Sequence, residues 1–310
     1  MKSEFFYPSS DGVTSIHAIE WIPTQKPKAV LQISHGMVEY IGRYDEFAEY
    51  LCEKGFYVVG QDHLGHGRSV SGEGGHGYFH KEKGNEYVVG DIHKLRQRTK
   101  EIYPDIPYFL LGHSMGSFLT RQYIQMHGSG LSGVIIMGTG YHGALELQMG
   151  RLLCRAIAAV KGDRYRSRLV NNLAFGGYNR KFRPARTEVD WLTKDTEIVD
   201  RYRKDPWCTF LFTVNAYYHM FTGMLQLTKK QNVEKIPKKL PILFVAGADD
   251  PVGNFGKGVD KVYRQYKRVG IKDVSLKLYP GDRHEILNET DRQQVYEDIG
   301  EWLLKFLQEI

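Results

Sequence analysis

The stretch Tyr108-Phe109-Leu110-Leu111-Gly112-His113-Ser114-Met115-Gly116 decides how the rest of the chain is interpreted. Its apolar beginning predicts a buried strand, and residues 118–126 have the pattern of a helix. The glycines two before and two after Ser114 let strand and helix pass closely, because they carry no Cβ. The stretch therefore predicts a sharp strand-to-helix turn that pushes the Ser114 hydroxyl out of a sheet, where a nucleophile is needed.

Two later predicted strands end in residues that can assist a serine nucleophile. The apolar run 242–246 ends in Gly247-Ala248-Asp249-Asp250-Pro251-Val252, and the run 274–279 ends in Pro280-Gly281-Asp282-Arg283-His284-Glu285. Because the carboxyl ends of parallel strands meet at one edge of a sheet, we expect the serine, an acid and the histidine to lie together. Histidine can take the serine proton near neutral pH, and a carboxylate can hold the imidazole in the required tautomer.

Strand-like and helix-like segments alternate over most of the chain. A hairpin is predicted over 3–22, followed by strands at 29–34, 56–61, 108–111 and 134–137 and by helices near 44–54, 86–103 and from 115 onward. The strands are apolar on both faces, which predicts an α/β fold with a mostly parallel sheet covered by helices on both sides. We expect residues 1–140 and 232–310 to form this core.

The alternation stops between residues 141 and 231, after the sixth predicted strand and before the seventh. Apolar residues at helical spacing predict one helix over about 145–160 and a second that covers 210–225. An interruption of about ninety residues is too long for a loop, so we expect a helical cap over the carboxyl edge of the sheet. The side chains expected to line an acyl pocket there are Leu145, Met149, Phe210, Tyr217 and Phe221; packing of the cap onto the core is their alternative role.

These motifs give the chain a resemblance to a known family. With His35-Gly36, Glu39, Arg43-Tyr44 and the run Asp62-His63-Leu64-Gly65-His66-Gly67-Arg68-Ser69, they resemble the monoacylglycerol lipase and lysophospholipase group of α/β-hydrolases over residues 28–137 and 240–309. The order serine, acid, histidine is the order that these hydrolases use. The resemblance implies an α/β-hydrolase fold and a serine hydrolase that cleaves a carboxylic ester of a monoacylglycerol or a lysophospholipid through an acyl-enzyme.

The resemblance also implies which residues form the site. In the family the acid stands three residues after the glycine that ends its strand, which gives Asp250 after Gly247, with Asp249 as the alternative. Ser114 and His284 would complete a catalytic triad. The backbone N–H groups of Met37 and Met115 resemble the family's pair of donors to the oxyanion.

Neighbouring loops are expected to be structural. Glu39 and Arg43 should form an ion pair that braces the loop after Met37, with substrate binding as the alternative, and residues 62–69 should shape a turn. His63 and His66 lie in a glycine-rich loop without a cysteine or a His-Glu-x-x-His helix, which argues against a metal site. The chain also has no glycine-rich phosphate loop, so we expect no cofactor.

Charge is distributed unevenly along the chain. The formal net charge is +6, and residues 151–187 alone hold ten Lys or Arg against one acid. A basic stretch confined to the cap does not favour nucleic-acid binding. Beside the apolar stripe it would suit peripheral contact with an anionic membrane or attraction of a phosphate-bearing head group; a solvated basic face is the alternative.

Two other functions stay open from the sequence. Amide or peptide cleavage, as in related aminopeptidases of this fold, would need an acidic group in the cap to bind a substrate amine, whereas the cap is basic. A receptor without activity would be expected to lack a triad residue. Since no apolar run approaches ~18 residues and no secretory signal precedes the first strand, we expect a cytoplasmic protein, with its three cysteines reduced and its oligomeric state open.

Overall fold

A single sheet organises the computed structural model, which describes residues 1–72 and 74–307. Its strands are β1 (Lys2–Pro8), β2 (Ser15–Trp21), β3 (Ala29–Ser34), β4 (Phe56–Gln61), β5 (Tyr108–His113), β6 (Gly133–Met137), β7 (Ile242–Gly247) and β8 (Val274–Tyr279). They lie side by side in the order β1-β2-β4-β3-β5-β6-β7-β8. The hairpin β1–β2 and the pair β2–β4 are antiparallel, and every later pair is parallel, which confirms the expected mostly parallel sheet.

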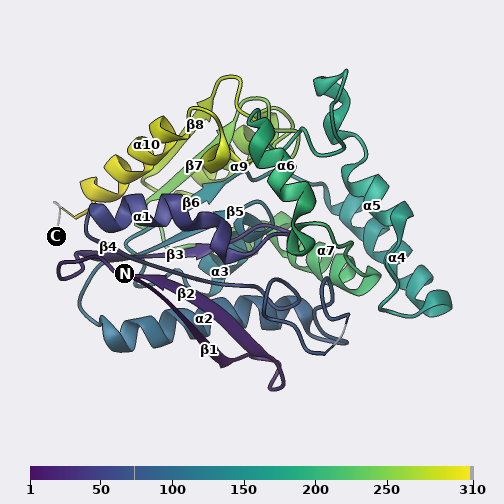
Figure 1. The fold of residues 1–310 in the computed structure, drawn as a ribbon, viewed down its shortest axis with the longest axis horizontal. Coiled ribbons are helices and arrows are strands. Elements are labelled where there is room, and N and C mark those ends of the chain that lie inside the picture. Colours follow the sequence, from purple (N-terminus) through teal and green to yellow (C-terminus); the bar gives the residue numbers. More distant parts are fainter. Residues whose placement is uncertain (73, 308–310) are drawn as a thin grey trace.

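Helices cover both faces of the sheet. The helices α1 (Asp45–Glu53) and α10 (Arg292–Lys305) pack on one face, and α2 (Gly84–Ile102), α3 (Met115–His127) and α9 (Lys257–Arg268) pack on the other (Figure 1). Successive side chains of a strand point to opposite faces. In β5, Leu110 therefore packs with α2 and α3, while Phe109 and Leu111 pack with α1 and α10. Burial on both faces explains why these strands are continuously apolar.

The predicted cap lies between β6 and β7. It contains α4 (Ala144–Lys161), α5 (Arg168–Phe175), α6 (Thr196–Lys204), α7 (Val214–Thr228) and α8 (Lys230–Val233), with 3-10 turns at Tyr178–Phe182 and Pro206–Cys208; two more such turns, Ile41–Tyr44 and Ile286–Asn288, lie in the core. Helix α4 packs along α7, and Figure 1 shows α4, α5, α6 and α7 gathered away from the chain ends. In the part of the chain that the structure describes, no helix has the length and apolarity to cross a membrane.

The second cap helix starts later than expected. Phe210 was expected within it, but α7 begins at Val214, where the Thr213 hydroxyl accepts a hydrogen bond from the Ala216 N–H at 3.2 Å. The preceding backbone bonds elsewhere: the Thr213 N–H donates to the Gly77 oxygen at 2.9 Å, and the Arg166 guanidinium donates to the Leu211 oxygen at 3.0 Å. These contacts hold Phe210 in a loop.

Candidate active site

Ser114 occupies the turn between β5 and α3. Its backbone has φ 53° and ψ −120°, an unusual conformation for a residue with a side chain. A Cβ on Gly116 would lie 2.0 Å from the Ser34 oxygen, and a Cβ on Gly112 would lie 2.3 Å from the Thr120 hydroxyl oxygen. Both positions therefore require glycine, and the turn leaves Ser114 at the carboxyl end of β5.

His284 and Asp250 form a hydrogen-bonded pair beside this turn. The imidazole Nδ1 lies 2.9 Å from the Asp250 Oδ2, and both side chains are buried. The second Asp250 oxygen accepts the Val252 N–H at 2.8 Å. A carboxylate only accepts hydrogen bonds, so Nδ1 carries the proton and Nε2 is left to accept one. His284 and Ser114 line the same cavity.

Asp249 has a different environment. Its carboxylate pairs with the Lys181 ammonium at 2.5 Å at the surface of the protein. The structure thus brings Asp250, and not its neighbour, against the imidazole of His284.

The loop after β3 approaches Ser114 from the other side. The His35 Nε2 accepts the His63 N–H at 2.9 Å, and burial holds the pKa of His35 well below its usual range. The neutral ring therefore carries its proton on Nδ1 and donates it to the Gly36 oxygen at 2.7 Å. In a trans peptide the C=O and N–H groups point in opposite directions, so the Met37 N–H points away from His35.

Met115 offers a second N–H group beside Ser114. It is the first residue of α3, and the first N–H groups of a helix have no acceptor within that helix. The two loops are in contact, because a Cβ on Gly36 would lie 3.0 Å from the Ser114 Cβ. The backbone positions expected to bind an oxyanion therefore flank the serine.

A buried group of charges ties this loop to the histidine. Glu39 accepts the Gly36 N–H at 2.5 Å and the Arg43 guanidinium at 3.0 Å, and Arg43 also binds both oxygens of Glu285 at 2.8 and 2.7 Å. Burial alone would raise the pKa of Glu39. The hydrogen bond with His113 and the charge of Arg43 together outweigh burial, so the pKa of Glu39 lies below its usual range. Burial would lower the pKa of His113, yet Glu39 raises it. The expected ion pair of Glu39 and Arg43 is present and braces the loop.

Two cavities meet at Ser114. The first has a volume of about 720 Å³ and a mostly apolar lining that includes Leu145, Met149, Leu153, Phe221 and Met224. The second has a volume of about 370 Å³ and a lining that includes Glu188, Trp191, Tyr202, Phe210 and His284. Met37 and Ser114 line both, so a bound ester with its carbonyl at Ser114 can extend into either space.

The structure divides the expected acyl-pocket residues. Leu145, Met149 and Phe221 line the apolar cavity, whereas Phe210 lines the second one. Tyr217 lines neither: its side chain is fully buried and its hydroxyl donates to the Asn171 Oδ1 at 2.9 Å. The ring of Tyr217 packs between Phe212 and Phe221, so Tyr217 has the alternative role expected for it, packing within the protein.

Three residues of the second cavity carry no pattern by which they could have been predicted. Glu188, Trp191 and Tyr202 come from the part of the cap between α5 and α7, which carries no apolar stripe. Only packing of this segment against the core brings them near Ser114.

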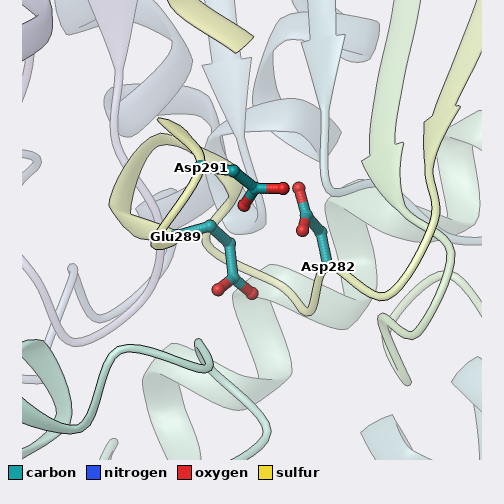
Figure 2. A group of neighbouring side chains, drawn as sticks. All are labelled: Asp282, Glu289 and Asp291. Carbon is teal, nitrogen blue, oxygen red and sulfur yellow. The ribbon is translucent and has the colours of Figure 1, made fainter. Parts of the chain in front are cut away.

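Three acidic side chains form a cluster in the segment of the chain that carries His284. Among the described residues, Asp282, Glu289 and Asp291 are the group whose ligand-type oxygens all lie within 4.8 Å of one another (Figure 2). A cation already lies among them, since the Lys194 ammonium is 2.6 Å from Asp282 and 3.3 Å from Asp291. Glu289 accepts the Lys194 N–H at 2.9 Å. The three carboxylates therefore hold Lys194 in place.

Comparison with known proteins gives a consistent result. A family model described as serine aminopeptidase, S33, matches residues 25–291. A monoacylglycerol lipase of Mycolicibacterium smegmatis is 27% identical over 312 residues, covering 99% of this chain and 98% of that protein. The structure of a thermostable carboxyl esterase from Bacillus coagulans in complex with glycerol has a TM-score of 0.92 at 31% identity over 99% of each chain. A lipase in an open form has a TM-score of 0.87 at 26% identity, covering 100% of this chain and 99% of that one.

Proposed function

The chain belongs to the serine aminopeptidase S33 family and is a serine hydrolase with the α/β-hydrolase fold, and on that premise we propose that it cleaves the carboxylic ester of monoacylglycerols or lysophospholipids. The observation that carries the proposal is the pair of cavities at Ser114. The larger, apolar one suits a single acyl chain, and the smaller one suits the alcohol.

The proposed reaction uses Ser114, His284 and Asp250. His284 Nε2 takes the hydroxyl proton as Ser114 Oγ attacks the ester carbon, and Asp250 stabilises the imidazolium that results. The Met37 and Met115 N–H groups bind the oxyanion of the tetrahedral intermediate. The imidazolium then gives its proton to the leaving alcohol. Water attacks the acyl-enzyme by the same route and releases the fatty acid.

The relatives support this substrate class. One is a monoacylglycerol lipase, and another is a carboxyl esterase whose structure holds glycerol, which is the alcohol of a monoacylglycerol. A lysophospholipid has the same single acyl chain, so the apolar cavity serves both, and the head group distinguishes them.

Aminopeptidase activity is the second candidate, since the family description names it. Such a reaction needs an acidic group of the cap to bind the substrate amine, and Glu188 in the smaller cavity is a candidate for that group. Its carboxylate, however, already pairs with the Arg203 guanidinium at 3.1 Å in an exposed position. An amine would have to displace Arg203, which favours the ester.

We also propose that the cap makes peripheral contact with an anionic membrane. Exposed apolar side chains stand on α4 and α5; they are Leu145, Met149, Leu152, Val160, Leu169 and Leu173. Leu145, Met149 and Leu173 also rim the apolar cavity. The exposed basic residues Arg155, Lys161 and Arg168 lie on the same helices. An apolar rim flanked by positive charge suits uptake of an acyl chain from a lipid surface.

A chain-length series tests the proposed substrate class. Each methylene buried in the apolar cavity contributes about 0.8 kcal/mol, so kcat/KM for p-nitrophenyl esters should rise by about fourfold per methylene from acetate to octanoate. Monoacylglycerols and lysophospholipids should be hydrolysed, and aminoacyl amides should not. A flat or falling series, or preferential cleavage of the amides, would contradict the proposal.

Two matched variants test whether the apolar cavity causes the preference for acyl chain length. Leu153→Trp puts a larger side chain into the apolar cavity and should move the preferred acyl chain to a shorter length. Leu152→Trp places the same side chain at the neighbouring, largely exposed position of α4 and should leave the series unchanged. Equal effects of the two variants would show that the cavity does not hold the acyl chain.

A further inference from the structure

We propose that cap residues 190–194 are a brace for the catalytic histidine and that Trp191 is the residue through which the brace positions the His284 imidazole. The inference rests on the proposed function, because it takes His284 as the base that activates Ser114. It concerns a segment that the sequence motifs do not include.

Backbone contacts join the brace to the loop that carries the histidine, residues 280–291. The His284 N–H donates to the Trp191 oxygen at 3.3 Å, and the Glu285 N–H donates to the Leu192 oxygen at 2.7 Å. Two consecutive residues of the loop are therefore fixed by two consecutive residues of the cap. A shift of the brace would shift the backbone of His284 itself.

Side chains fasten the same two segments on both sides of these bonds. The Arg283 guanidinium donates to the backbone oxygens of Asp190 and Thr193. The Thr193 hydroxyl donates to the Glu289 carboxylate at 2.9 Å. The acidic cluster in Figure 2 belongs to the histidine loop, and it receives the Lys194 ammonium at the end of the brace. The Asp282 side chain is fully buried, so loss of the Lys194 charge would leave a buried acid unpaired.

The ring of Trp191 lies against the imidazole. The centroids of the two rings are 5.1 Å apart. The ring of Tyr178 also packs on Trp191, with a centroid distance of 4.9 Å. An aromatic face within about 6 Å attracts a cation. His284 becomes a cation while the tetrahedral intermediate forms, so Trp191 favours the charged state that the reaction passes through.

Other charged groups face the same imidazole. Asp250 binds Nδ1 and favours the imidazolium, whereas His113, whose ring centroid is 4.8 Å away, opposes it when protonated. Glu285 follows His284 in the chain, and its carboxylate pairs with the Arg43 guanidinium that Glu39 shares. Trp191 differs from all of these groups because it comes from the cap and carries no charge.

Substitution of Trp191 tests the inference. Trp191→Leu keeps an apolar side chain but removes the aromatic face, and we expect kcat for p-nitrophenyl butyrate to fall by about tenfold with KM within about twofold. Trp191→Phe should recover most of the loss. The acid limb of the pH profile of kcat/KM should move to lower pH in Trp191→Leu, because the imidazolium is less stabilised. A side chain that only supports the fold would not move this limb.

Two further variants test the anchor of the brace and control for the loss of a tryptophan. Lys194→Met leaves Trp191 in place but removes the anchor, so it should lower kcat in the same direction with little effect on KM. Trp302→Phe changes a tryptophan of α10 whose ring packs on Phe109 and Phe306, and it should leave kcat, KM and the pH profile unchanged. Thermal unfolding of each variant identifies a loss of fold.

The outcomes separate this inference from the proposed function. An unchanged kcat and acid limb in Trp191→Leu, or a Phe variant no better than Leu, would overturn the role of Trp191. The rate of labelling by a fluorophosphonate reads the activation of Ser114 without any ester. A wild type that labels but cleaves no ester would refute the proposed substrates, while the labelling rates of the same variants would still decide the role of Trp191. A wild type that does not label would overturn both.

Discussion

At the scale of single residues, Asp249 and Asp250 are neighbours with different environments. Asp250→Asn should lower the acylation rate by about 10⁴-fold, because an amide no longer holds the proton on Nδ1 of His284. Asp249→Asn removes only the exposed pair with Lys181, so its rate should stay within a few fold of the wild type. The rate of fluorophosphonate labelling measures both variants. The reverse ranking would assign the carboxylate role to Asp249.

The sequence could not separate these two acids on residue pattern alone. Their positions in the turn after β7 decide the matter: the Asp250 N–H donates to the Gly247 oxygen at 3.2 Å, and its side chain accepts the Val252 N–H. This local bonding aims the Asp250 carboxylate at His284. The hydrogen bond between His113 and Glu39, which raises the pKa of His113, was missed for a related reason, since the two residues are distant in the sequence.

At the scale of elements, Asp91 fastens the β1–β2 hairpin to α2. Its carboxylate accepts the Ser9 hydroxyl at 2.8 Å and the Ser10 N–H at 2.5 Å. Burial raises the pKa of Asp91 to about 6, above the value of about 3.9 expected in the unfolded chain. The folded state therefore holds the proton more tightly, and this contribution to stability is present below about pH 4 and is lost as the pH rises to about 6.

The Asp91→Asn variant should show this dependence in its stability. An amide has no proton to lose, so the free energy of unfolding of the variant should improve relative to the wild type by roughly 2 to 3 kcal/mol between pH 4 and pH 7. Urea denaturation of both proteins at the two pH values gives the difference. Asp105→Asn, at an exposed position, is the control. A difference between wild type and Asp91→Asn that does not change with pH would contradict the expectation.

Most elements of the core could be predicted because each carries a local signal. The strands from β3 to β7 are buried along their whole length and mostly apolar, and α1 and α2 have an apolar face. In the cap, α4 also has an apolar stripe. The helix α6 was missed, since Val199 is its only buried residue and no apolar stripe marks it. The start of α7 was misplaced because the contacts that hold residues 210–213 come from Gly77 and Arg166, which no local pattern reveals.

At the scale of the whole molecule, the sequence predicted where the site residues converge, because parallel strands carry their carboxyl ends to one edge. The sequence did not predict that two separate cavities meet at Ser114. Their separation depends on how residues 176–213 pack against the core, and the brace at Trp191 depends on contacts across about ninety positions of the chain, too distant for periodicity to reveal.

Vesicle sedimentation tests the proposed membrane contact. The triple variant Arg155→Glu, Lys161→Glu, Arg168→Glu should lose binding to anionic vesicles, since each basic residue near the surface contributes about 1 kcal/mol. Wild-type binding should weaken as salt rises to 0.15 M, where exposed charges are screened over about 8 Å. Arg166 is unsuitable for the test because its side chain is bonded to the Leu211 and His76 oxygens.

A charge-matched control keeps this test specific. Lys26, Lys239 and Lys272 are exposed and precede β3, β7 and β8, so they lie at the opposite end of the sheet from the cap. Their reversal to Glu gives the same net charge and should leave vesicle binding intact. Equal loss in both triple variants, or no preference of the wild type for anionic over neutral vesicles, would remove the membrane role.

Peptide mapping of the covalent adduct tests the central claim most directly. The wild type, treated with a long-chain fluorophosphonate, should gain one adduct, and mass spectrometry should locate it at Ser114. Ser114→Ala should keep the fold, gain no adduct and lose hydrolysis of octanoate esters and monoacylglycerols, because no other group can form the acyl-enzyme. An adduct on a different residue, or ester hydrolysis by Ser114→Ala at the wild-type rate, would contradict the account.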